Sequence, residues 1–305
     1  MQTLLAAHWQ RHLKGFYVYN NMSTAILLAM GAMVTGGLAD LIYKSVQNRG
    51  INSATFVFYQ AITFTAVIWI IAVLFDQLSR IITATWLFGL PLGVLGYTGI
   101  VLFVSSLKEG NASVYAPLFR LSFIITAGIA FVVLGEPVTL AKILGILLAV
   151  VAVLSLANFK GFTSTGRSQL RSVLYLLGAT LAFGIAGALN KEAINQGSPT
   201  IPLVIVQTIT FTAASFIHML ATRRVRPNGT TLRFAPLVGI LQLSWTALLF
   251  QSLQTGDASI SFPIVQLSFV LTAILAVAFL REAVTRNLVI GLSAASLAVI
   301  AFALA

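Results

Sequence analysis

Two ionisable residues, Arg120 and Asp40, lie inside long apolar stretches of this 305-residue chain. An Arg guanidinium can hold a carboxylate or phosphate through two parallel hydrogen bonds, and an Asp carboxylate can carry a proton. An ionisable side chain at the centre of a membrane costs at least ~2.5–3.5 kcal/mol on insertion scales, so each is a functional hypothesis by default. The plain alternative is a buried Arg120–Asp40 ion pair that only holds helices together.

The composition indicates an integral membrane protein. Hydrophobic residues make up 58% of the chain and charged residues 8%, whereas a soluble domain carries about 25% charged residues. This excludes a soluble enzyme, a nucleic-acid-binding module and a disordered protein. The net charge of +11 therefore indicates cytoplasmic loops rather than a nucleic-acid partner. The chain has no Cys and its three His residues show no ligand spacing, so we expect no metal site.

The apolar runs predict an all-α membrane fold with ten transmembrane helices. Each run is about 20 residues long, as a membrane-spanning helix requires, and lacks the alternating polarity of barrel strands. Residues 1–22 are interpreted as an N-terminal tail, because they lack the apolar core and cleavage site of a secretory signal. The predicted spans are 23–43, 54–75, 84–107, 112–134, 140–158, 170–190, 200–221, 234–254, 258–280 and 286–304.

An internal repeat divides the chain into two similar halves. Residues 107–139 and 253–285 are identical at 15 of 33 positions, and a shared Q-x-ITFTA pattern aligns Gln60 with Gln207. We therefore predict five-helix repeats at 23–159 and 170–305, joined by a linker at 160–169. Because five is odd, the second repeat enters the membrane from the opposite side. Such inverted repeats are typical of alternating-access transporters, with the site near the midplane at the repeat interface.

The repeat places Gln266 opposite Arg120, at similar depth across the pseudo-twofold axis. We hypothesise that Arg120 binds an anionic group of the substrate and that Gln266 binds a polar group. Asp40, in the last turns of the first span, is a candidate for the coupling proton, because burial penalises its charged form. The alternative for Asp40 is a solvated carboxylate paired with Lys44, four residues further along the helix.

Pro117 and Pro263 lie three residues before Arg120 and Gln266 and are predicted hinges. Proline removes a backbone hydrogen bond and bends a helix, and neighbouring helices in a membrane can compensate for this loss. Glu136 follows the fourth span of the first half, where we expect it to cap the next helix or to pair with Lys142.

Four further polar or aromatic residues are candidates for substrate binding. Gln60 and Gln207 lie within the second and seventh spans, where an amide either lines a cavity or hydrogen-bonds to a neighbouring helix. Tyr97 and Trp245 lie in the middle of their spans rather than at the ends, where aromatic residues usually form an interfacial belt. Their mid-span position favours a place within the cavity, and the alternative is a place in the interfacial belt.

The fourth span of each half carries a recognisable pattern, with a Pro near its start and an acidic residue at its end. The two copies read P-LFRLSFIITAGIAFVVL-GEPVT and P-IVQLSFVLTAILAVAFL-REAVT, and Gly145 and Gly291 follow within the fifth spans. Over residues 23–304 the chain resembles the ten-helix EamA-type family of the drug/metabolite transporter superfamily. The resemblance implies export or exchange of small metabolites, drugs or amino-acid-like solutes, without an ATP site or other cofactor.

This chain departs from the family pattern in two respects. The family often has Arg where this chain has Gln60 and Gln207, and it is usually neutral where this chain has Asp40 and Arg120. The substrate of a family member therefore does not carry over to this chain.

Together these observations predict a secondary active transporter, an exporter or exchanger of a small organic metabolite. We expect an anionic or zwitterionic substrate such as an amino acid, moved by alternating access and driven by a proton gradient or by exchange. The alternative is a passive uniporter or channel. An enzyme would need clustered acid, base or metal-binding groups, which the sequence does not offer. The expected partners are the substrate and the lipid bilayer; the sequence leaves open whether the chain forms a homodimer.

The expected location is a bacterial inner membrane, as a multi-pass protein. Lys and Arg residues number five on the side of the termini and twelve on the other side. The positive-inside rule therefore predicts that both termini lie outside, whereas the family resemblance implies that they are cytoplasmic.

Overall fold

The computed structural model describes residues 2–46, 49, 51–107, 112–157, 167–222, 226–280 and 284–305. Every regular element in these ranges is a helix, which confirms the predicted all-α class. The helices are α1 (Gln2–Val46), α2 (Ser53–Leu74), a short 3-10 turn η1 (Leu78–Arg80), α3 (Thr83–Ser106), α4 (Ala112–Arg120), α5 (Ser122–Val132), α6 (Leu140–Leu156), α7 (Arg167–Asn195), α8 (Thr200–Ala221), α9 (Gly229–Thr255), α10 (Ala258–Gln266), α11 (Ser268–Leu280) and α12 (Arg286–Ala303).

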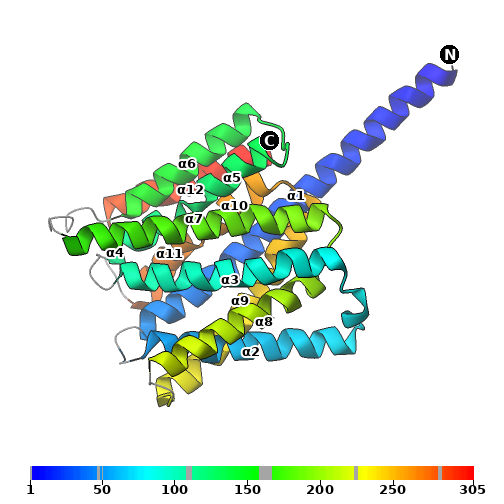
Figure 1. Ribbon diagram of the computed structural model, residues 1–305. Helices are drawn as coiled ribbons and strands as arrows, with labels where there is room; N and C mark the ends of the chain where they lie inside the picture. Colours follow the sequence, from blue (N-terminus) through cyan, green and yellow to red (C-terminus); the bar gives the residue numbers. More distant parts are fainter. Residues whose placement is uncertain are drawn as a thin grey trace.

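These helices form the ten predicted spans. Within the described residues, nine helical stretches are long and apolar enough to cross a membrane, and α6 is a shorter apolar helix of 17 residues. The first span, Met22–Val46, is the second part of α1, which begins at Gln2. The helix therefore runs through residue 22 without a break, and its first turns project beyond the bundle (Figure 1).

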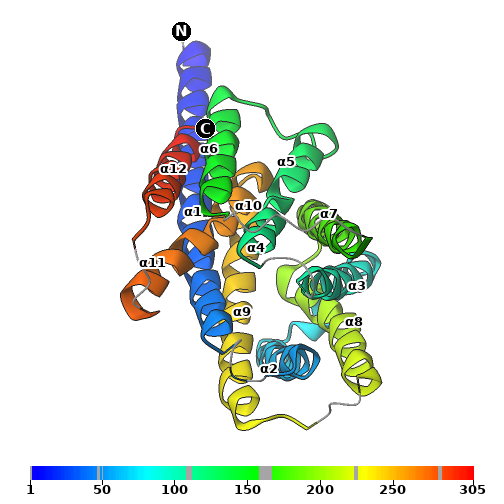
Figure 2. The same cartoon turned by 90° about the vertical axis from the view of Figure 1, so that its left-hand side faces the viewer.

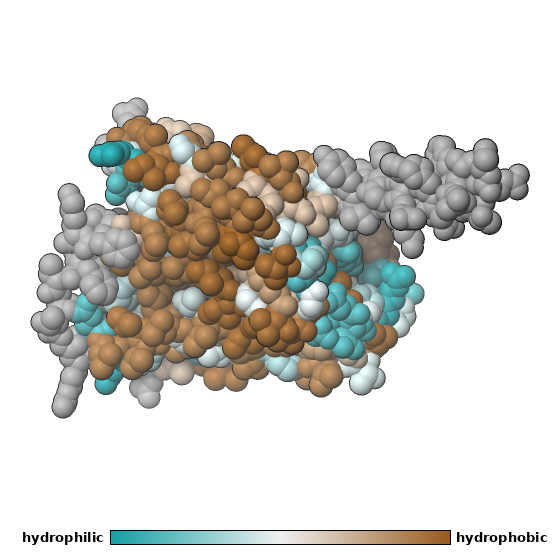
Figure 3. Space-filling view, turned by 90° about the horizontal axis from the view of Figure 1, so that it is seen from above, coloured by the Kyte–Doolittle hydropathy of each residue, from teal (hydrophilic) through white to brown (hydrophobic). Residues whose placement is uncertain are grey.

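Many large apolar side chains lie on the outer surface of the bundle. In Figure 3 a broad hydrophobic band lies across the middle of the molecule, and hydrophilic residues gather towards its two ends. Large apolar side chains such as Val132 and Leu74, at 85% and 73% exposure, point outwards. In water such a surface would drive aggregation, so it is suited to contact with lipid tails.

The most extensive helix–helix contacts are between the two halves rather than within either half. α1 lies along α9, α3 along α7, and α6 along α12 (Figures 1 and 2). The repeat makes α1 equivalent to α7 and α9 equivalent to α3, so the first two contacts are two copies of one contact. The interface between the halves therefore runs through the centre of the molecule.

Two equivalent glycines allow close approaches between helix backbones. A side chain at Gly93 in α3 would overlap the Gln207 carbonyl oxygen and the Thr210 hydroxyl in α8. At Gly239, its counterpart in α9, an added Cβ would lie 2.7 Å from the carbonyl oxygen of Gln60 in α2. Small residues let membrane helices approach backbone to backbone, and van der Waals packing then holds them together.

The fourth and ninth spans are each broken into two helices. α4 ends at Arg120 and α5 begins at Ser122, whereas α10 ends at Gln266 and α11 begins at Ser268. At the single residue between each pair, the backbone tightens. Leu121 N donates to the carbonyl three residues back, at 3.1 Å, and Leu267 N makes the same contact at 3.1 Å. The sequence predicted continuous spans bent at Pro117 and Pro263; both prolines lie inside the first helix of each pair, and each break comes four residues later.

Candidate functional site

Arg120 is the centre of a polar network at the break between α4 and α5. Its guanidinium forms an ion pair with the carboxylate of Asp40 in α1. A second nitrogen, Nη1, donates to Oε1 of Gln266 in α10 at 3.1 Å. The nine residues of α4 and of α10 each extend about 13 Å at 1.5 Å per residue. Arg120 and Gln266 therefore approach from opposite sides and meet deep within the bundle.

The amide of Gln266 joins both halves of the molecule. Its Oε1 accepts from Arg120, and its Nε2 donates to Oγ of Ser122 at 2.9 Å. Ser122 is the first residue of α5, so the network includes the N-terminus of that helix. Two of the predicted site residues are thus in direct contact across the interface between the halves.

The equivalent serine of the second half, Ser268, is different. It is 1% exposed, and its hydroxyl has no hydrogen-bond partner of ordinary geometry among the described residues, although it lies close enough to Asp40 to interact with the carboxylate. A buried hydroxyl usually finds a partner, because leaving it unpaired costs free energy. Ser268 therefore places a buried hydroxyl beside Asp40.

The ion pair at the centre is not sealed. The side chains of Arg120 and Asp40 keep 23% and 25% of their surface exposed, while Gln266 is 8% exposed and Ser122 is 1% exposed. A small polar solute that reaches these two side chains can exchange hydrogen bonds with them. The geometry can thus hold a carboxylate on Arg120, a cationic group on Asp40 and an amide or hydroxyl on Gln266.

Gln60 and Gln207 lie elsewhere and make equivalent contacts in the two halves. Oε1 of Gln60 accepts from the hydroxyl of Tyr43, and Nε2 of Gln207 donates to Oδ1 of Asn190 at 2.9 Å. Tyr43 and Asn190 occupy equivalent positions in α1 and α7. Each glutamine therefore connects the first two spans of its own half, as expected for an amide that hydrogen-bonds to a neighbouring helix.

The two aromatic candidates are placed differently from each other. Trp245 in α9 packs on Gly36, one helical turn from Asp40, and an added Cβ on that glycine would lie 2.9 Å from the indole ring. Tyr97 in α3 faces α8, where its hydroxyl lies 2.6 Å from Nδ1 of His218. Trp245 is thus beside the polar network, whereas the contacts of Tyr97 are with the neighbouring helix.

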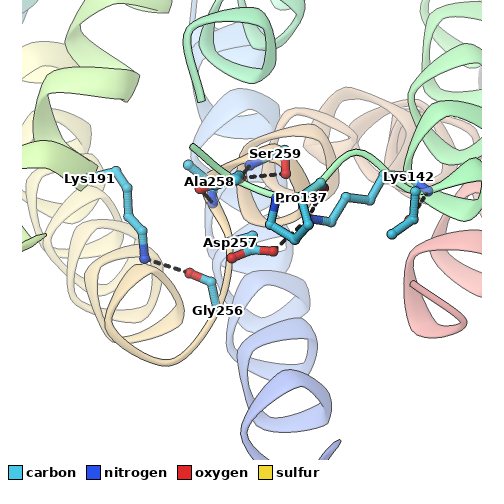
Figure 4. Close-up of polar contacts among 9 residues, drawn as sticks. Pro137, Lys142, Lys191, Gly256, Asp257, Ala258 and Ser259 are labelled. Atoms are coloured by element: carbon cyan, nitrogen blue, oxygen red, sulfur yellow. Dashed lines mark hydrogen bonds and ion pairs between the residues drawn. The ribbon is translucent and has the colours of Figure 1, made fainter. Parts of the chain in front are cut away.

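A second polar cluster lies where α5 and α9 end and α10 begins, on the side that carries the termini (Figure 4). Here the prediction for Glu136 was wrong. Its carboxylate caps α10 of the other half rather than the next helix, and Lys142 pairs with Asp257 at 2.6 Å rather than with Glu136. The physical reason is that inversion of the repeats brings the end of one broken span against the start of the other. The repeat equivalent, Glu282, lies outside the described residues.

Sequence reasoning missed Asp257 and the role of Lys191. The signal for Asp257 was its place directly before α10, a position favoured for Asp. Lys191, near the end of α7, donates to the carbonyl oxygens of Leu253 and Gly256 at 2.7 and 2.8 Å. No local pattern predicts this contact, because its partners lie more than 60 residues away.

Comparison with known proteins gives consistent results. The model of the EamA-like transporter family matches the chain twice, over residues 23–157 and 170–304. No curated protein sequence matches. A solved structure titled "Crystal structure of protein" shares 16% sequence identity, with a TM-score of 0.77 over 92% of this chain and 96% of that chain. At this identity the likeness concerns the fold alone, a helical arrangement that extends over nearly the whole length of both chains.

Proposed function

This chain belongs to the EamA-like transporter family, and from this membership we propose that it is a secondary active transporter working by alternating access. As a family member it is a multi-pass membrane protein that transports small solutes, not an enzyme. The proposed cargo is a small organic metabolite with a carboxylate or another anionic group, in zwitterionic form such as an amino acid or as an anion.

The Arg120–Asp40 ion pair, at the break of the fourth span, is the observation that supports this proposal. A substrate carboxylate competes with Asp40 for Arg120, and the released Asp40 can then take a substrate ammonium group or a proton. The N-termini of α5 and α11 also lie at the breaks, and positive helix ends at a discontinuous span favour anionic groups. Gln266 and Ser122 would hold the remaining polar atoms.

Counterflow in proteoliposomes tests the proposal most directly. We expect saturable uptake of a labelled carboxylate-bearing solute into vesicles loaded with the same unlabelled solute, and no uptake of neutral solutes of similar size. A passive uniporter would exchange solute but would not accumulate it against a gradient under an imposed pH difference. Flux without saturation or counterflow would identify a channel and contradict the proposal.

Asp40→Asn tests proton coupling separately from binding. We expect this variant to keep exchange of a solute that carries only an anionic group at constant pH but to lose uptake driven by a pH gradient, because an amide cannot carry the coupling proton. Equal pH-driven uptake in the variant and the unchanged protein would remove Asp40 from the coupling role.

A bacterial inner membrane is the proposed location, with both termini outside as the charge distribution indicates. A fluorescent reporter fused after Ala305 checks the orientation. Fluorescence of a reporter that folds only in the cytoplasm would show that the termini are inside, as the family resemblance implies.

A further inference from the structure

Glu136 connects the two halves on the side that carries the termini. Its carboxylate accepts from the backbone N of Ala258 at 2.7 Å, the backbone N of Ser259 at 2.9 Å and the Ser259 hydroxyl at 2.5 Å. Glu136 follows α5 in the first half, and the donors form the first turn of α10 in the second half. A carboxylate at a helix N-terminus satisfies unpaired N–H groups and interacts favourably with the helix dipole.

An ion pair beside it, between a buried lysine and a partly exposed aspartate, also joins the halves. Lys142 Nζ lies 2.6 Å from Oδ2 of Asp257 and donates to the Pro137 carbonyl at 2.8 Å (Figure 4). The Lys142 side chain is 1% exposed and that of Asp257 is 24% exposed. Lys191 holds the same loop, because it donates to the carbonyl of Gly256, the residue before Asp257.

Two members of this cluster, Glu136 and Lys142, are more buried than the central ion pair. Glu136 is 8% exposed and Lys142 is 1% exposed, whereas Arg120 and Asp40 keep about a quarter of their surface. On the termini side the two halves are therefore joined through a buried carboxylate and a buried ammonium group.

We propose that Glu136, Lys142 and Asp257 form a termini-side latch, which holds the transport path closed on this side and must release before the central site opens there. This inference rests on the alternating access proposed above. It assigns to these residues a role in gating, separate from binding the solute.

The two halves differ at the latch. At the same repeat offset, Glu136 corresponds to another glutamate, but Lys142 corresponds to Leu288 and Asp257 to Asn111. The ion pair is therefore encoded on one side only, and it favours closure on the termini side over closure on the other. Lys142→Leu and Asp257→Asn each replace a residue with the one found at the equivalent position of the other half. Each variant therefore removes the ion pair by introducing a residue type that the repeat already has at that position.

Cysteine labelling measures the latch without any need for transport. The chain has no Cys, so Phe262→Cys supplies a single thiol on α10. Phe262 lies four residues before Gln266, towards the termini side, and is 7% exposed. An impermeant maleimide is added to sealed vesicles whose termini side faces the medium. We expect slow labelling in the otherwise unchanged protein, and labelling about tenfold faster with Lys142→Leu or Asp257→Asn, since a charged hydrogen bond shifts an equilibrium by about this factor.

Ser198→Ala is the matched control, because the Ser198 hydroxyl is also buried on this side but has no hydrogen-bond partner among the described residues. Its labelling rate should equal that of the Phe262→Cys protein. Fast labelling of the Phe262→Cys protein alone would contradict the proposed latch. Equal labelling rates with and without Lys142→Leu or Asp257→Asn would contradict it as well. Asp257→Asn keeps a side chain that can cap α10, so it serves if Lys142→Leu does not fold. Saturable counterflow with unchanged labelling would refute only the latch, whereas faster labelling without counterflow would refute only the proposed function.

Discussion

The first half carries Arg120 at the break of its fourth span and Asp40 in its first span, whereas the second half has Gln266 and Gly187 at the equivalent positions. The scaffold around these residues is nearly the same in both halves. Thr126 donates to the carbonyl of Gly184 at 2.9 Å, and its counterpart Thr272 donates to Gly37 at 3.1 Å. The duplicated contacts thus hold helices together, and the unduplicated charges are where we place function.

Arg120→Gln should have the largest effect, because it removes the difference between the halves and places a glutamine at both equivalent positions. We expect counterflow to fall at least about a hundredfold, since removing one partner of a buried charge pair costs roughly 2–5 kcal/mol and also removes the anion-binding group. Proteoliposome counterflow measures the loss, and the thermal unfolding midpoint of the purified variant measures any accompanying instability.

The double variant Arg120→Gln with Asp40→Asn separates binding from structure. If the ion pair only joined helices, neutralising both partners would restore stability and transport together. We expect stability to recover relative to Arg120→Gln alone while transport stays lost. Recovery of counterflow in the double variant would remove Arg120 from the binding site.

Gly93→Ala and Gly239→Ala test the duplicated scaffold. Both should destabilise the protein, by about 1–3 kcal/mol, because the added methyl group meets backbone atoms of a neighbouring helix. Gly93→Ala should be the worse, since its methyl group would overlap both Gln207 and Thr210, whereas that of Gly239 approaches the Gln60 carbonyl at 2.7 Å. Thermal unfolding in detergent ranks the two variants. Equal or reversed losses would show that the helices can move apart at Gly93.

The sequence was sufficient to predict the fold and the central pair, for identifiable reasons. Ten apolar runs and the aligned Gln60 and Gln207 define the spans and the repeat, and lipid permits few other structures. Arg120 and Asp40 stood out because a charge is rare in such runs. The repeat then predicted that Arg120 and Gln266 face each other across the axis at similar depth, and the 3.1 Å contact between them agrees with that placement.

The termini-side contacts were not predictable in the same way. Glu136 lies next to Pro137 and Lys142 in sequence, which favours a local partner, but inversion of the halves places the start of α10 beside it. Tyr97 is mid-span by position, yet the side of a helix that a residue faces depends on how α3 crosses α8. These outcomes depend on packing between distant spans, which spacing along one chain does not encode.

Gln207→Leu and Gln60→Leu form the comparison with the smallest expected effect. Each removes a hydrogen bond between the first two spans of one half, and such bonds within membrane proteins average about 0.6 kcal/mol. We therefore expect small, similar losses of stability in the two variants and unchanged counterflow. The unfolding midpoint and the counterflow rate are measured on the same preparations. A large loss of counterflow in one variant alone would show that its glutamine contacts solute, and that this pair, although duplicated in sequence, is functionally asymmetric like Arg120 and Gln266.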